Sequence, residues 1–173
     1  MRTALLVVAP EMFRDEEYAE PKRILEARGA SVTTASVAPG ECSGKLGMRA
    51  TAQTSVLAAA TRVWDSVTFV GGPGAEVFFD DADAHALARM VRDGGGIVSA
   101  ICIAPSILAR AGLLDGVRAT AFPSQEGDLK AHGAIWTGAP VTVHGTILTG
   151  NGPEAAGAFG NALADLLGLP ADH

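Results

Sequence analysis

The sequence predicts an α/β fold, a three-layer sandwich in which a mainly parallel sheet has helices on both faces. Its indicators are apolar runs of strand length, segments of helical periodicity between them, and glycine clusters where the runs end. Runs that are apolar throughout indicate strands buried on both faces, which is typical of parallel sheets. The 173 residues suit one domain, expected over residues 1–173.

The first half of the chain begins with a strand and alternates from there. Its predicted strands are residues 4–9, 31–37 and 64–70. Between the first two strands, apolar residues recur at helical spacing, and Gly29 is expected to end that helix. Residues 39–52 are rich in proline and glycine, which predicts a loop or a short hairpin.

The second half continues the alternation in shorter pieces. A helix is predicted over residues 83–92, a strand over 97–101, and a helix over 104–111 with Pro105 tolerated in its first turn. Further strands are expected over 118–121 and 141–143, and residues 147–149 are expected to pair after a turn. The last helix is predicted to run to about Leu167.

Charge and cysteine content narrow the possible functions. With 19 acidic and 13 basic residues the net charge is −6, which argues against nucleic acid or an anionic membrane as a partner. The apolar start is too short to span a membrane and is followed by acidic residues, unlike a signal peptide, so a cytoplasmic location is expected. Cys42 and Cys102 are expected to be free thiols, and no metal or cofactor is expected.

Cys102 lies where the strand over residues 97–101 meets the helix over 104–111. This arrangement is similar to the nucleophile elbow of hydrolases, and it places the side chain at the carboxyl edge of the sheet. The helix N-terminus would favour the thiolate, and its N–H groups, with one from the Gly71-Gly72 turn, could hold an oxyanion. The alternative is a small buried hydrophobic residue, and Cys42, in its glycine-rich loop, is expected to have no chemical role.

A reactive thiol requires a partner, and two kinds of residue are available. The four histidines (His85, His132, His144 and His173) have no spacing that links them to Cys102, and surface positions are expected for them. The carboxylates after the first strand reach the same sheet edge (Glu11, Glu16, Glu17 and Glu20). A buried, protonated carboxyl would donate a hydrogen bond to the thiolate, whereas the alternative is a solvated carboxylate at a helix start.

Three segments, in the order in which they occur along the chain, resemble sequences of the ThiJ/PfpI superfamily. They are Glu17 four residues before Pro21, the run Val70-Gly71-Gly72-Pro73-Gly74, and the run Ala100-Ile101-Cys102-Ile103-Ala104-Pro105. The segment over residues 108–116 continues the match. This resemblance implies a flavodoxin-like fold and a homodimer. It also implies that Cys102 is the reactive thiol, Glu17 its buried protonated acid, and the N–H groups of Gly72 and Ile103 the oxyanion pocket.

The sequence departs from the best-known branches of that superfamily at two positions. The residue after the cysteine, histidine in peptidase-like members, is Ile103, and Phe122 occupies the position of the histidine of deglycase-like members. Peptidase or amidase activity is therefore disfavoured, because an amine leaving group needs a general acid. Glu76, after the glycine turn, could point into the pocket, across a subunit boundary, or into solvent.

Three functions remain open on this basis. The first is a glyoxalase- or deglycase-like enzyme, a lyase or hydrolase whose Cys102 adds to a small reactive carbonyl while Glu17 moves the proton. The second is a sensor of oxidative stress, or a chaperone, that uses reversible oxidation of Cys102. An isonitrile hydratase-like or amidase-like activity is a weaker third. The expected partner is a small-molecule substrate.

Overall fold

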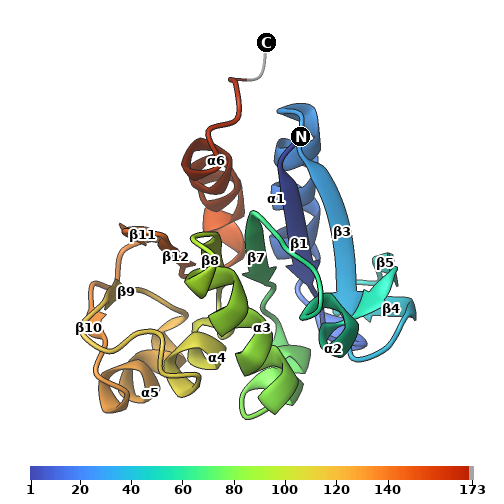
Figure 1. Cartoon of the computed structure of the whole chain (residues 1–173). Helices are drawn as coiled ribbons and strands as arrows, with labels where there is room; N and C mark the ends of the chain where they lie inside the picture. Colours follow the sequence, from blue (N-terminus) through green and yellow to red (C-terminus); the bar gives the residue numbers. More distant parts are fainter. Residues whose placement is uncertain (172–173) are drawn as a thin grey trace.

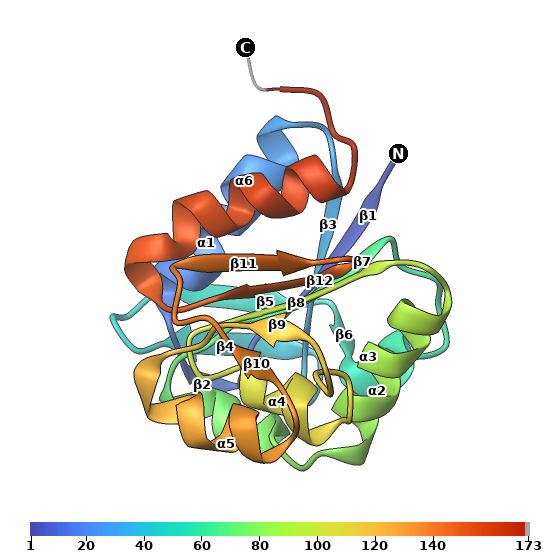
Figure 2. The same ribbon diagram turned by 90° about the vertical axis from the view of Figure 1, so that its left-hand side faces the viewer.

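The computed structural model describes residues 1–171, which form three layers around a seven-stranded sheet (Figures 1 and 2). The strand order is β11-β12-β8-β7-β1-β3-β6, and only β11 runs antiparallel to its neighbour. The strands are β1 (Thr3–Val7), β3 (Ser31–Ser36), β6 (Thr54–Ser55), β7 (Ser66–Phe69), β8 (Ile97–Ile101), β11 (Val141–His144) and β12 (Ile147–Gly150). The predicted mainly parallel α/β fold is confirmed.

Helices cover both faces of this sheet, as Figure 2 shows. One face carries α1 (Asp15–Ala27) and α6 (Ala156–Leu166), and the other carries α2 (Val56–Ala59), α3 (Ala82–Asp93), α4 (Pro105–Arg110) and α5 (Glu126–Ala131). Short 3-10 helices cover Pro73–Phe78, Pro123–Gln125 and Pro153–Ala155. Each face has its own hydrophobic core, because successive side chains of a strand point to opposite sides of the sheet.

Helices α1 and α6 approach each other closely, and Gly160 permits this. A Cβ at Gly160 would lie 3.0 Å from the Cα of Pro21 and 2.9 Å from Cδ1 of Ile24. Pro21 lies inside α1 and is buried. Helix α1 also packs on β1 and β3 of the sheet, and its first turn lies at the carboxyl ends of β1, β7 and β8, on the lower side of the sheet in Figure 1.

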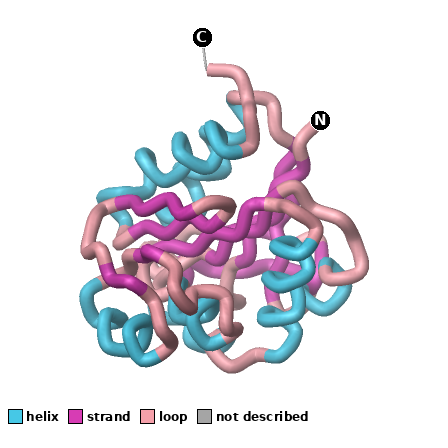
Figure 3. Tube along the Cα trace, turned by 60° about the vertical axis from the view of Figure 1, so that its left-hand side comes forward, coloured by secondary structure: helices cyan, strands magenta, loops and turns pink. Residues whose placement is uncertain are grey.

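Two small sheets lie outside the main one (Figure 3). The predicted hairpin is β4 (Gly40–Gly44) with β5 (Arg49–Ala52), and β2 (Glu11–Phe13) pairs with β4. The strand predicted over residues 118–121 is only β9 (Arg118–Ala119), and it pairs with β10 (Ile135–Trp136) rather than with the main sheet. The elements that sequence patterns missed (β2, β6, β10, α2 and α5) are too short to show a period.

Candidate active site

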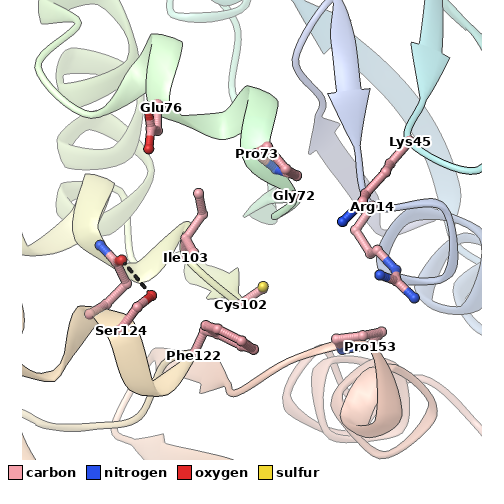
Figure 4. A pocket seen from close by; sticks show the side chains of 11 residues that line it. Arg14, Lys45, Gly72, Pro73, Glu76, Cys102, Ile103, Phe122, Ser124 and Pro153 are labelled. Carbon is pink, nitrogen blue, oxygen red and sulfur yellow. Dashed lines mark hydrogen bonds between the residues drawn. The ribbon is translucent and has the colours of Figure 1, made fainter.

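Cys102 occupies a strained turn between β8 and α4. Its φ of 65° lies in the left-handed region, which residues with a Cβ adopt rarely and at a cost of about 1–3 kcal/mol. The turn is held from both sides, because the Cys102 N–H donates to the carbonyl of Gly150 at 2.9 Å and its carbonyl accepts from the N–H of Phe122 at 2.8 Å. The expected nucleophile elbow is present, with the side chain directed into a pocket (Figure 4).

The Gly71-Gly72 turn after β7 requires glycine at both positions. A Cβ on Gly71 would lie 2.5 Å from Cβ of Cys102 and 2.5 Å from Oε1 of Glu17. Gly72 has φ 100°, and a Cβ there would lie 2.4 Å from the backbone nitrogen of Arg14. This close approach brings the backbone N–H of Gly72 to the sulfur of Cys102, where that of Ile103 also points. The predicted pair of N–H groups therefore converges on one sulfur atom.

Glu17 lies in the first turn of α1, next to Cys102, and its side chain has no solvent exposure. Among the described residues, neither carboxyl oxygen has a hydrogen-bond partner at ideal distance and angle. The Cys102 thiol and the Gly71 N–H are their polar neighbours. Burial raises the pKa of Glu17 from 4.5 to about 8, and Cys102 and Arg14 offset this only in part. Glu17 is therefore protonated at neutral pH, unlike a solvated helix-start carboxylate.

The Cys102 thiol is buried as well, with 8% of its surface exposed. Burial, followed by the charge of ionised Glu17, raises the pKa of Cys102 to about 12, although the N–H groups of Gly72 and Ile103 favour the thiolate. The sequence led us to expect a lowered pKa from the helix N-terminus, and the raised value contradicts that expectation. The reason is that desolvation of the buried thiol outweighs the N–H groups that favour the thiolate.

The pocket above these residues has a volume of about 490 Å³. Figure 4 shows the Cys102 sulfur near its centre, with Ile103 and Phe122 on one side of it and Arg14 and Lys45 on the other. Eleven residues line it: Arg14, Lys45, Gly72, Pro73, Glu76, Cys102, Ile103, Phe122, Ser124, Gln125 and Pro153. The sequence left the direction of the Glu76 side chain open, and the structure places Glu76 in the pocket wall.

The histidines that the structure describes all lie outside this pocket. His85 Nε2 is 2.7 Å from the carbonyl of Phe79, His132 Nδ1 is 2.8 Å from that of Asp128, and His144 Nδ1 accepts from the N–H of Arg118. His173 lies outside the described residues. The carboxyl of Glu17 is therefore the titratable partner that the fold brings to Cys102.

The remaining candidates take structural or surface positions. Glu11 is exposed, and Glu16 and Glu20 pair with arginines. Cys42 is buried in the β4–β5 hairpin within the α1-side core and is not among the residues that line the pocket. In residues 1–171 no group of three metal-binding side chains occurs, and no helix is long and apolar enough to cross a bilayer.

Sequence reasoning missed two cationic residues of the site, Arg14 and Lys45. Arg14 directly precedes α1, so its place at the edge of the sheet could have been inferred from that of Glu17. Lys45 lies at the tip of the β4–β5 hairpin, and no local pattern connects it with Cys102. Only the folding of this hairpin over the start of α1 places Lys45 in the pocket wall.

Comparison with known proteins gives consistent relatives over nearly the whole chain. The model of the DJ-1/PfpI family matches residues 2–166. An uncharacterised protein of Methanocaldococcus jannaschii is 36% identical over 159 residues, covering 90% of this chain and 78% of that protein. A deglycase of Thermococcus kodakarensis is 28% identical over 149 residues, covering 86% and 90%.

The solved structures agree with this assignment. A ThiJ/PfpI domain protein of Brachyspira murdochii superposes with a TM-score of 0.91 at 31% identity, and the match covers 96% of each chain. The resemblance inferred from the cysteine elbow and the glycine turn is thus confirmed, together with the flavodoxin-like arrangement of the sheet. The chain belongs to the DJ-1/PfpI family.

Proposed function

We propose that this chain is an enzyme that acts on small reactive carbonyls, with glyoxalase- or deglycase-like activity through Cys102 and Glu17. The observation that carries the proposal is one fully buried carboxyl held against the thiol in a pocket. Membership of the DJ-1/PfpI family, with a relative named as a deglycase, supports it. A pocket of about 490 Å³ is large enough for a small dicarbonyl compound.

The proposed reaction starts with addition of the thiol to an aldehyde. The sulfur of Cys102 bonds to the aldehyde carbon, and the carboxylate of Glu17 takes the thiol proton. The C=O electron pair moves to oxygen, which accepts hydrogen bonds from the N–H groups of Gly72 and Ile103. Glu17 returns this proton to the oxygen, which gives a hemithioacetal and restores the carboxylate.

Glu17 then moves a second proton. It transfers the proton of the former aldehyde carbon, through an enediol, to the neighbouring carbonyl carbon, which gives a thioester of a 2-hydroxy acid. Water cleaves the thioester and regenerates the thiol. The aldehyde carbon is oxidised and its neighbour reduced, so the whole reaction consumes only the dicarbonyl and one water. No amine leaves in this sequence, so it does not need a histidine at position 103 or 122.

The test is turnover of methylglyoxal. We expect Cys102→Ser to abolish it and Glu17→Gln to lower kcat by about 100-fold or more, the usual contribution of a general acid or base. Cys42→Ser is the matched control, because this cysteine is buried and does not line the pocket. Turnover by Cys102→Ser at the native rate would refute the proposal.

A second candidate, reversible oxidation of Cys102, is favoured by the two N–H groups that converge on its sulfur. They could donate hydrogen bonds to the oxygens of a sulfenic or sulfinic acid. Treatment with hydrogen peroxide followed by mass spectrometry would show this as added oxygen on Cys102 but not on Cys42. Fast oxidation without dicarbonyl turnover would favour the sensor over the enzyme.

We further propose that the chain acts as a homodimer in the cytoplasm. The DJ-1/PfpI membership supports this assembly, and the net charge of −6 accords with a partner that is not nucleic acid. Sedimentation equilibrium of the purified chain tests the assembly, and a mass of one chain at micromolar concentration would contradict it.

A further inference from the structure

The pocket has a cationic wall in an acidic protein. The chain carries a net charge of −6, yet two of the three charged side chains that line the pocket are Arg14 and Lys45. Figure 4 shows both on the same side of Cys102, with Glu76 across the pocket from them. An anion that entered would be attracted to one wall and repelled by the other, which would orient it.

The cationic wall is built by specific contacts. The N–H of Lys45 donates to the carbonyl of Phe13 at 2.8 Å. The carboxylate of Asp15 accepts from the N–H of Leu46 at 3.0 Å and from that of Met48 at 2.9 Å. These bonds secure the tip of the β4–β5 hairpin to the start of α1, so Lys45 is held next to Arg14.

Both cations retain capacity to bind an anion. The ammonium of Lys45 has no hydrogen-bond or ion-pair partner in residues 1–171. Arg14 donates to Glu16 from Nε at 2.8 Å, and its two terminal nitrogens have no partner in the same part of the chain. Four N–H donors of the guanidinium are therefore open to an oxyanion, for which a planar fork is suited.

We propose that Arg14 and Lys45 form a subsite for an oxyanion, so that the preferred substrate is a small carbonyl compound bearing a carboxylate or phosphate group. The reacting carbonyl lies at Cys102, and the anionic end lies against the hairpin wall. Glu76 disfavours the reverse orientation. This assignment of the substrate class rests on the proposed carbonyl chemistry, whereas the anion subsite itself does not.

Alkylation of Cys102 tests the subsite without any turnover. Iodoacetate and iodoacetamide react with a thiolate in the same way, with a new S–C bond and release of iodide, but only iodoacetate carries a charge. The readout is the rate constant for iodoacetate divided by that for iodoacetamide at Cys102. This ratio is then divided by the same ratio for a small free thiol. Changes in the thiol pKa cancel in this ratio.

We expect Lys45→Gln and Arg14→Gln each to lower this ratio about fivefold to tenfold. Lys22→Gln is the matched control, because it also removes one positive charge. Lys22 lies on α1 outside the pocket and pairs with Glu26. An unchanged ratio in both pocket variants would overturn the subsite. An equal fall in Lys22→Gln would also overturn it, because the effect would then come from overall charge.

Two aryl glyoxals connect the subsite to the reaction. We expect kcat/KM to be higher for 4-carboxyphenylglyoxal than for phenylglyoxal, and Lys45→Gln to remove most of this preference. Turnover of both compounds without preference, with unchanged alkylation ratios, would refute the subsite and leave the proposed function standing. Turnover of neither, with ratios that fall as expected, would refute the proposed function and support the anion subsite.

Discussion

The buried carboxyl of Glu17 makes stability depend on pH in a way that can be measured. Its pKa is about 8 in the folded chain, against an ordinary value of 4.5. A raised value means that the folded state holds the proton while the unfolded state has lost it. The protonated carboxyl of Glu17 therefore stabilises the folded state relative to its ionised form. This stabilisation is fully present below about pH 4.5 and is lost as pH rises through 8.

The size of the effect follows from these two values. One pKa unit corresponds to about 1.4 kcal/mol, so the interval from 4.5 to about 8 amounts to about 5 kcal/mol. That is a large part of the 5–15 kcal/mol stability of a typical domain. Glu17→Gln has nearly the same shape and no titration. The stability of the variant relative to the native chain should therefore rise by about 1.4 kcal/mol per pH unit between pH 5 and 7.5.

Urea denaturation at half-unit steps from pH 5 to 8 measures this difference. Glu26→Gln is the matched control, because Glu26 lies on the exposed side of the same helix. Cys102→Ser should keep most of the native slope, because burial rather than the thiol is the main cause of the shift. Parallel stability curves for Glu17→Gln and the native chain would refute our account of Glu17 as a buried, protonated acid.

Further predictions concern the base, the glycine turn and the chain end. If Glu17 takes the thiol proton, kcat/KM for methylglyoxal should rise with pH to a plateau above about 8, and a pH-independent native rate would contradict this. Gly71→Ala should destabilise the chain by about 2–3 kcal/mol and abolish turnover, because its Cβ would overlap Glu17 and Cys102. Gly127→Ala, with open space around it in α5, should instead be neutral or stabilising by up to about 1 kcal/mol in the same melts. Arg28→Ala should lower the free energy of unfolding by about 2–3 kcal/mol, because buried Arg28 donates hydrogen bonds to the carbonyls of Pro170, Leu169 and Asn161. As a control, Arg49→Ala at an exposed position should change the free energy of unfolding by less than about 1 kcal/mol.

The fold and the position of Cys102 could be predicted from sequence because their signals are local. The strand over residues 97–101, the turn at Cys102 and the following helix are adjacent in the chain. The glycines at 71 and 72 follow an apolar strand, and the carboxyl ends of parallel strands meet at one edge. By contrast, the sequence predicted a strand over residues 118–121 but not its shortening to Arg118–Ala119 or its partner Ile135–Trp136, because two paired residues carry too little pattern to identify a partner.

The sequence by itself determined that a cysteine, a glycine turn and a carboxylate would meet at the carboxyl edge of a parallel sheet. Only the tertiary structure decided their ionisation, because burial is a property of every segment packed around Glu17 and Cys102. It also decided that Lys45 joins the site, through a hairpin tip bonded to Asp15. Contacts between segments 31 residues apart depend on chain packing, which no local periodicity encodes.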